Sequence, residues 1–223
     1  KELLPSIGKV MTTSIRTFQP WGDLWGNVPK EGFFHTPPGG ISQVVKNYGG
    51  GILVCGGSHI LDLVLYFHGR PTRLYATMEQ PKGLDYDLQA AALIETPNGP
   101  VHWEALAHPL HKIGFLQDGW DEQVEITGTR GRLSIYSAKW DEVEFKASRL
   151  VHVDNETGQA IEYRYDPVSP FDRAVMFFCQ NIAAGIQGAQ TRLTGYEVDE
   201  LIAHIKMSAR LGQAVDVNWR TVN

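Results

Sequence analysis

The chain has 223 residues, of which 43% are hydrophobic and 20% are charged, a composition typical of a folded domain and not of a disordered or low-complexity chain. Its formal net charge is −5 and it has no long basic run, so nucleic acid is excluded as an expected partner. No segment approaches the roughly 20 apolar residues that cross a bilayer, and the only cysteines, Cys55 and Cys179, lie too far apart in sequence to suggest a CxxC pair. We therefore expect a cytoplasmic protein that does not contact a membrane.

Three elements are predicted in the first third of the chain. Residues 7–18 are rich in β-branched and apolar residues without helical spacing, which predicts a strand that ends before Pro20. Residues 21–38 combine Trp, Phe, Pro and Gly without any periodicity, which indicates a long loop of the kind that often carries function. Apolar residues then recur at steps of three and four over residues 52–67, which predicts a helix.

The middle of the chain predicts strands joined by tight turns, and the last third is predicted to be helical. Asn98-Gly99 is a strong hairpin signal, and hairpin connections imply antiparallel pairing. The predicted strands cover residues 72–79, 88–96, 101–107, 122–127, 132–137, 143–146, 151–154 and 161–165. The predicted helices cover residues 171–186 and a segment from a capping box at 194–197 to Gly212, and a short strand follows at 215–217.

This order of elements predicts one α+β domain over residues 1–223, with a mostly antiparallel open sheet and helices packed on one face. Residues 88–94 are apolar on both sides of their strand, so we expect the other face to meet a second subunit or domain, and we predict a homo-oligomer through this face. The chain begins at Lys1, without an initiator Met or a signal peptide, and is expected to be part of something longer.

A glycine-rich segment from Gly49 to Asp62 carries the most specific pattern in the sequence. Gly56 and Gly57 lie inside the predicted helix, where each costs about 1 kcal/mol relative to Ala, so another group is expected to approach the helix backbone there. The segment resembles the glycine-rich helix of the Gfo/Idh/MocA family of nicotinamide-dependent sugar and polyol oxidoreductases, whose pattern is GGG, a few apolar residues and D-x-G-x-H-x-x-D. Gly57, His59 and Asp62 match this pattern in register.

The resemblance extends over nearly the whole chain. Residues 7–10 resemble the family's first strand after the nucleotide domain, residues 125–133 its late strand-turn-strand, and residues 194–212 its last long helix. The family implies a fold like the C-terminal domain of glyceraldehyde-3-phosphate dehydrogenase. It also implies a preceding Rossmann domain, missing from this chain, that binds NAD or NADP and supplies a lysine from a Glu-Lys-Pro motif. The chain alone is then expected to be inactive and to bind no cofactor.

The same resemblance implies that the parent protein transfers a hydride between nicotinamide and a sugar, amino sugar or polyol. His59 is the candidate for moving the hydroxyl proton, because an imidazole exchanges protons near neutral pH; a buried or capping histidine is the alternative. Asp62 either orients this imidazole or is a solvated helix carboxylate. Cys55 stands where the family has an aspartate, and a neutral thiol is a poor partner for a substrate hydroxyl.

Cys55 leaves several interpretations of the parent protein open. It takes a different substrate, relies on His59 and the absent lysine, or has lost its activity and serves as a non-catalytic binding or oligomerisation module. The apolar neighbours of Cys55 disfavour a role as nucleophile.

Two aromatic clusters are candidates for substrate contact. In the long loop, Trp21, Trp25 and His35 are suited to stacking on the apolar face of a sugar, with packing against the sheet as the alternative. The second cluster spans the end of the predicted hairpin and the following loop. It contains Trp103, His108, His111, Asp118, Trp120 and Asp121, of which Trp103, His108, Trp120 and Asp121 are the candidates for substrate contact. His108 and His111 lack a nearby third ligand, so no metal site is expected.

Overall fold

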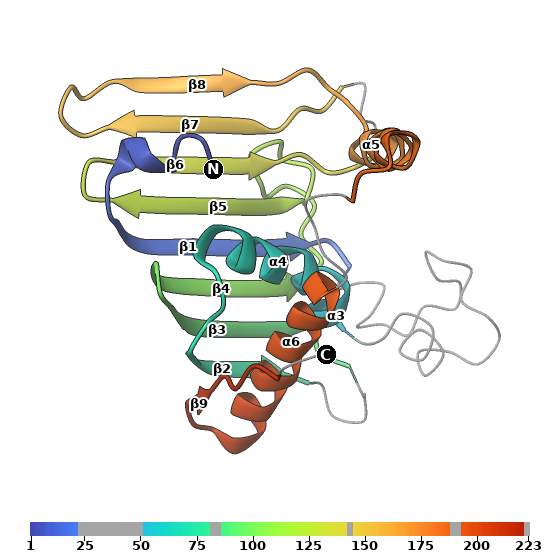
Figure 1. Cartoon of the computed structure of the whole chain (residues 1–223). Coiled ribbons are helices and arrows are strands. Elements are labelled where there is room, and N and C mark those ends of the chain that lie inside the picture. The colour runs from blue at the N-terminus through green and yellow to red at the C-terminus, as the bar shows by residue number, and fades with distance from the viewer. Residues whose placement is uncertain (22–50, 81–85, 142–144, 188–192, 221–223) are drawn as a thin grey trace.

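The computed structural model of the chain describes residues 1–21, 51–80, 86–141, 145–187 and 193–220. These residues form one nine-stranded sheet in the order β8-β7-β6-β5-β1-β4-β3-β2-β9, with helices α3, α4 and α6 on one side of it (Figure 1). The predicted α+β class and the open, mostly antiparallel sheet are therefore confirmed.

The described elements, in chain order, are the 3₁₀ helix η1 (Leu4–Ile7), β1 (Val10–Gln19), α3 (Ile52–Cys55), α4 (Gly57–His68), β2 (Arg73–Glu79), β3 (Gln89–Thr96), β4 (Gly99–Ala107), β5 (Asp121–Gly128), β6 (Gly131–Ser137), β7 (Arg149–Asp154), β8 (Ala160–Arg164), α5 (Pro170–Ala184), α6 (Leu193–Leu211) and β9 (Val215–Asp216).

Strand β1 lies in the centre of the sheet and sets its two faces. It pairs parallel with β4 on one side and antiparallel with β5 on the other, and every other neighbouring pair is antiparallel. Its residues alternate as a strand requires, with Ile15 and Thr17 fully buried and Arg16 and Phe18 on the opposite face. The face with the buried residues is called the helix face below, and the opposite one the open face.

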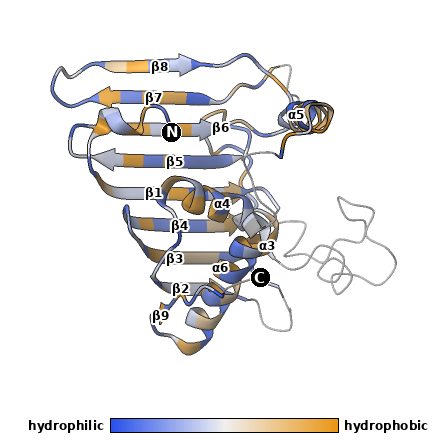
Figure 2. Ribbon diagram, in the orientation of Figure 1, coloured by the Kyte–Doolittle hydropathy of each residue, from blue (hydrophilic) through white to orange (hydrophobic). Residues whose placement is uncertain are grey.

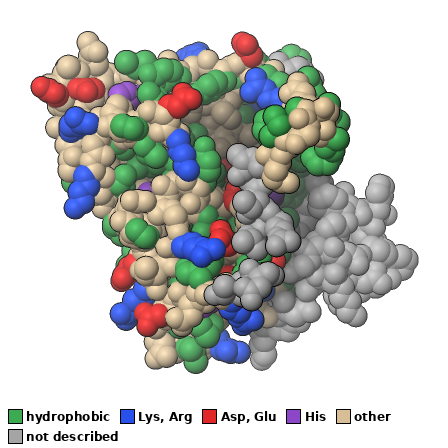
Figure 3. Space-filling model, in the orientation of Figure 1, with side chains coloured by type: hydrophobic (Ala, Val, Ile, Leu, Met, Phe, Trp, Pro, Cys, Tyr) green, Lys and Arg blue, Asp and Glu red, His purple; other side chains and the backbone are tan. Residues whose placement is uncertain are grey.

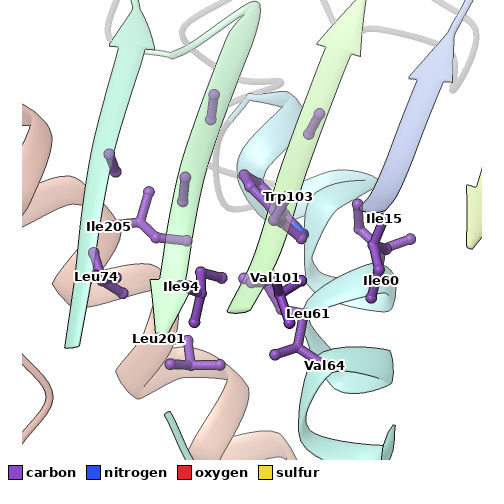
Figure 4. Close-up of a cluster of buried hydrophobic side chains, with 14 of the residues drawn as sticks. Ile15, Ile60, Leu61, Val64, Leu74, Ile94, Val101, Trp103, Leu201 and Ile205 are labelled. Carbon is purple, nitrogen blue, oxygen red and sulfur yellow. The ribbon is translucent and has the colours of Figure 1, made fainter. Parts of the chain in front are cut away.

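The core lies between the helix face and the helices that cover strands β1 to β4. Apolar side chains of α4 and α6, such as Leu61 and Leu201, point at strand residues such as Val101 and Ile94 (Figure 4). Trp103 is the largest fully buried side chain and lies beneath the start of α4. Burial of these side chains is what holds the two helices on the sheet.

Three predicted elements differ from the structure in their extent. The helix expected over 52–67 is interrupted at Gly56, which separates α3 from α4. Helix α6 begins at Leu193, so the capping box expected at residues 194–197 lies inside its first turn. The strand expected at 143–146 falls mostly outside the described residues, and Phe145 and Lys146 are not in a strand.

The helix expected at residues 171–186 forms as α5, but it does not pack on the sheet. Ser169 caps its start, because the Ser169 hydroxyl accepts the N–H of Asp172 at 3.2 Å, and Gly185 ends it in a left-handed conformation. Several of its apolar side chains are 57–64% exposed: Phe171, Val175, Met176, Phe177, Phe178 and Ile182. Green side chains are prominent on the exposed surface of α5 in Figure 3. In Figure 2 α5 is largely orange and stands beside the sheet. No helix within the described ranges is long and apolar enough to span a membrane.

The glycine-rich turn between α3 and α4 lies directly on the sheet, which confirms that another group approaches its backbone closely. A Cβ at Gly56 would lie 2.6 Å from the Gln19 amide nitrogen, and a Cβ at Gly57 would lie 2.8 Å from the Trp103 ring. A Cβ at Gly51 would overlap the carbonyl oxygen of Asp87. The groups that approach the glycines are therefore side chains and backbone of this chain.

We predict that Gly57→Ala lowers the free energy of unfolding by about 1–2 kcal/mol, because the added methyl group meets a tryptophan ring that has no room to move. Urea denaturation of both proteins measures the difference. Gly195→Ala in α6 is the matched control, since no described atom lies within 4 Å of a Cβ there and alanine favours the helix. A Gly57→Ala protein as stable as the Gly195→Ala protein would contradict this packing.

The other end of α4 is held by a buried histidine. The Nδ1 atom of His68 lies 3.3 Å from the carbonyl oxygen of Asn98, and the Asn98 side-chain amide donates to the carbonyl of His68 at 3.1 Å. These two bonds tie the end of α4 to the hairpin between β3 and β4. Burial lowers the pKa of His68, and the hydrogen bond to Asn98 only partly offsets this effect.

We predict that His68 makes the protein less stable as the pH falls below about 6.5. The unfolded chain then binds a proton at its ordinary pKa of 6.5, whereas the folded protein resists protonation until a lower pH. Thermal denaturation between pH 7.5 and 5.5 measures the loss. The His68→Asn variant keeps a donor for the Asn98 carbonyl and should lose less stability over that pH interval than the wild type; equal losses would contradict the prediction.

Candidate active site

One edge of the sheet brings together the ends of several elements. Because β1 and β4 run parallel, their last residues, Gln19 and Ala107, are paired at this edge. β5 starts there, with Asp121 opposite Phe18. The turn at Gly56 rests on Gln19, so α3 and α4 also begin at this edge (Figure 1).

Asp87 fixes the start of α3. Its carboxylate accepts the N–H of Leu53 at 2.8 Å, and its carbonyl oxygen accepts the N–H of Ile52 at 3.1 Å. The side chain is buried, and burial raises the pKa of this carboxyl although the bond from Leu53 opposes the shift. Asp87, which is distant in sequence from α3, therefore acts as the N-terminal cap of this helix. No sequence signal marks Asp87 for this role, because the contact depends on the tertiary fold.

His59 is exposed on α4, three residues after the Gly56 turn. Its neighbours Ile60 and Leu61 point into the core, so the imidazole points away from the sheet and not into the apolar interior. Asp62 lies one helical turn further, where burial raises its pKa and the nearby charge of His59 lowers it. The two side chains therefore interact electrostatically, which is compatible with the predicted orienting role of Asp62 but does not test it.

Cys55 is the last residue of α3 and is partly buried. Its backbone N–H donates to the carbonyl of Gly51 at 2.9 Å, closing the single turn of this helix. Burial raises the pKa of the Cys55 thiol, so the thiol is neutral at pH 7. A neutral thiol is a weak nucleophile and a weak proton acceptor, so the chemical capacity of the turn rests on His59.

A hydrogen-bonded group of polar side chains lies on the helix face beside the turn. The Thr17 hydroxyl donates to Oε1 of Glu122 at 2.7 Å. The Gln19 amide donates to the same oxygen at 3.2 Å and to the Thr17 hydroxyl at 3.0 Å. The Trp21 indole donates to the amide oxygen of Gln19 at 2.5 Å. No sequence pattern was used to predict Thr17, Gln19 or Glu122 as site residues. For Thr17 and Gln19, polar residues at alternating positions on the buried side of a strand are a detectable signal.

Two of the predicted aromatic residues meet at this edge. The rings of Trp21 and Trp120 lie 6.3 Å apart, edge to face at 87°. Trp120 is almost fully buried, and Trp21 is partly exposed beside Gln19. The fold therefore joins residues from the two predicted clusters, and substrate contact by either of them stays a prediction.

The remaining described candidates lie at the same edge or beneath it, and the backbone N–H of His108 donates to the carbonyl of Gln19 at 2.9 Å. Trp103 is 1% exposed and fills the core beneath Gly57. His108 is buried in its own loop, where Nδ1 accepts the N–H of Leu110 at 2.9 Å and burial lowers the pKa of the ring. Asp121 forms an ion pair with Arg16 at 2.9 Å on the open face. Nε1 of Trp103 and Nε2 of His108 are buried without a hydrogen-bond partner among the described residues, and substrate contact by any of the three stays a prediction.

Trp25 and His35 lie outside the described residues. Within the ranges that the structure describes, no group of three or more His, Cys, Asp or Glu side chains is arranged to hold a metal ion.

The fold matches solved structures of sugar and polyol enzymes. Myo-inositol 2-dehydrogenase from Lactobacillus plantarum aligns with a TM-score of 0.65 and 17% identity, over 97% of this chain and 60% of that one. Aldose-aldose oxidoreductase from Caulobacter crescentus, complexed with glycerol, aligns with a TM-score of 0.71 and 14% identity, over 96% of this chain and 58% of that one. Levoglucosan dehydrogenase in complex with NADH and L-sorbose aligns with a TM-score of 0.69 and 17% identity, over 99% and 62% of the two chains.

At these low sequence identities, the structural similarity shows a shared fold alone. The chain spans about 60% of the length of the structures it matches. A search of curated protein sequences found no match. The family model described as the GFO/IDH/MocA C-terminal domain matches residues 6–134, which include the glycine-rich turn, His59 and the strands of the candidate site. The chain therefore belongs to the GFO/IDH/MocA C-terminal domain family.

Proposed function

We propose that this chain is the substrate-binding and oligomerisation part of an NAD(P)-dependent oxidoreductase acting on a sugar, amino sugar or polyol. The observation that carries the proposal is the exposed imidazole of His59 on the helix that starts at the Gly56 turn. Family membership and the sugar- or polyol-related names of the matched structures support it. In this proposal His59 accepts the proton of the substrate hydroxyl and returns it in the reverse direction.

The cofactor is proposed to be held by another domain. NAD or NADP would supply hydride chemistry, but the described glycines at the starts of α3 and α4 do not form a cradle for its phosphates. Gly51, Gly56 and Gly57 are each covered by protein atoms, namely Asp87, Gln19 and Trp103. A dinucleotide-binding glycine must leave room for pyrophosphate beside it. These three described glycines do not fit the cofactor, so we assign its site to a separate dinucleotide-binding domain.

Two side chains near His59 bear on its proposed role. Asp62 interacts with it electrostatically, since the charge of His59 lowers the pKa of Asp62 against the raising effect of burial. Cys55, with its raised pKa, supplies no negative charge at neutral pH. The neutral thiol at this position favours the alternative function, a binding or oligomerisation module without dehydrogenase activity. The turnover assay described next distinguishes the two functions.

We predict that His59→Ala lowers kcat for NAD(P)-linked turnover about 100- to 10,000-fold, the usual contribution of a positioned general base. The assay uses the full-length protein that contains this chain, a panel of sugars and polyols, and both nicotinamide cofactors. Tyr66→Ala is the matched control, because Tyr66 is an exposed aromatic residue of the same helix, about two turns further from the Gly56 turn. Unchanged turnover in His59→Ala would remove His59 from the mechanism, and no turnover by the wild type with any substrate would favour the non-catalytic module.

The proposed oligomer uses the open face of the sheet. Tyr75 and Leu93 are paired across β2 and β3 on this face and are 43% and 44% exposed. Strand β3 was predicted to be apolar on both faces. Its open face is in fact partly polar, because Gln89 and Glu95 lie on the same side as Leu93. An apolar pair with a polar surround is typical of the centre and rim of a subunit interface.

We predict that Leu93→Lys weakens self-association, because it places a charge in the apolar centre of the proposed interface. Size-exclusion chromatography with light scattering measures the mass in solution. Ile161→Lys is the matched control, since Ile161 is similarly exposed but belongs to the helix face of β8. A monomeric wild type, or association that survives Leu93→Lys, would count against the open face as the interface.

A further inference from the structure

Glu122 is a carboxylate that the fold holds rigidly at the candidate site. It lies on the helix face at the start of β5, paired in register with Thr17. Its Oε1 atom accepts two hydrogen bonds, from the Thr17 hydroxyl and the Gln19 amide. Both donors belong to the buried face of the central strand, so the side chain has little freedom to move.

The second oxygen of Glu122 is left for another partner. Among the described residues Oε2 makes no hydrogen bond, and no Lys or Arg side chain forms an ion pair with Glu122. The cation on the adjacent strand, Arg16, lies on the open face and is paired with Asp121. Glu122 is only half-buried, so a molecule arriving from solvent can reach it. Because Oε2 is not buried, water satisfies it in the free protein, and a hydroxyl group that displaces this water can donate to the same lone pairs.

Contacts through the protein connect Glu122 to the helix that carries His59. The Gln19 amide, which donates to Glu122, lies against Gly56. Gly56 immediately precedes α4, and His59 is the third residue of that helix. One rigid group of side chains therefore fixes both the carboxylate and the start of the helix.

We propose that Glu122 binds the substrate, with Oε2 accepting hydrogen bonds from hydroxyl groups of an uncharged sugar or polyol. A fixed carboxylate oxygen accepts two neighbouring hydroxyls well, whereas it repels a carboxylate or phosphate group at the same place. The proposal rests on the proposed function and narrows it: the site selects neutral polyhydroxyl compounds over sugar acids and sugar phosphates.

The test compares turnover by the wild type and by Glu122→Gln in the full-length protein, with glucose, sorbitol and myo-inositol as neutral substrates and gluconate and glucose 6-phosphate as anionic ones. Glutamine keeps the shape and an acceptor for Thr17 but removes the charge. KM for neutral substrates should rise about 10- to 100-fold, as expected for loss of a charged hydrogen bond. kcat should change little, because hydroxyls away from the reacting carbon are bound equally before and during reaction.

The ratio of kcat/KM for neutral to anionic substrates should fall about tenfold or more in Glu122→Gln, and this ratio does not depend on how much of the variant is folded. Glu125→Gln is the matched control, because Glu125 is on the same strand but contacts Ser134 and Arg132 on the open face. A wild type that prefers anionic substrates, or a Glu122→Gln protein with an unchanged ratio, would overturn the inference and leave the proposed function standing. Absence of turnover with all substrates would overturn both.

Discussion

The architecture of the candidate site depends on the close packing of a glycine-rich turn against the sheet. Side chains at Gly56 and Gly57 would collide with Gln19 and Trp103, so only glycine lets α4 lie this close to β1 and β4. Asp87 holds the preceding turn by accepting the N–H groups of α3. The position of His59 is therefore set by contacts buried beneath it, while the imidazole itself stays exposed.

The central strand β1 has two functions on one face. Near its middle, Ile15 belongs to the core beneath Ile60 of α4 (Figure 4). Near its end, Thr17 and Gln19 are equally buried but are polar, and they satisfy each other and Glu122 by hydrogen bonds. Burying polar groups is unfavourable unless they are bonded in this way. The change from apolar to polar along one strand marks where packing ends and the candidate site begins.

The sequence predicts the fold well and the candidate site only in part. Strand alternation, hairpin turns and the glycine pattern are local signals, and they were sufficient for the sheet, α4 and α6 and for singling out His59. Asp87 and Glu122 carry no local signal, because Asp87 bonds the distant start of α3 and Glu122 bonds side chains of the neighbouring strand β1. Trp103 and His108 show the opposite case, since residue types suited to sugar binding are buried here by packing that a local pattern does not reveal.

Helix α5 exposes apolar side chains that the other described residues do not cover. A helix of 15 residues is marginally stable in water without tertiary packing, and α5 buries none of its residues. Its cap at Ser169 and the left-handed Gly185 fix its ends but contribute only about 1 kcal/mol each. The apolar face of α5 is larger than scattered surface residues would make it, and patches of this kind mark surfaces that meet another protein surface. A surface that meets another protein surface is compatible with the proposed function, in which this chain binds the substrate and transfers its proton while a separate domain binds the cofactor.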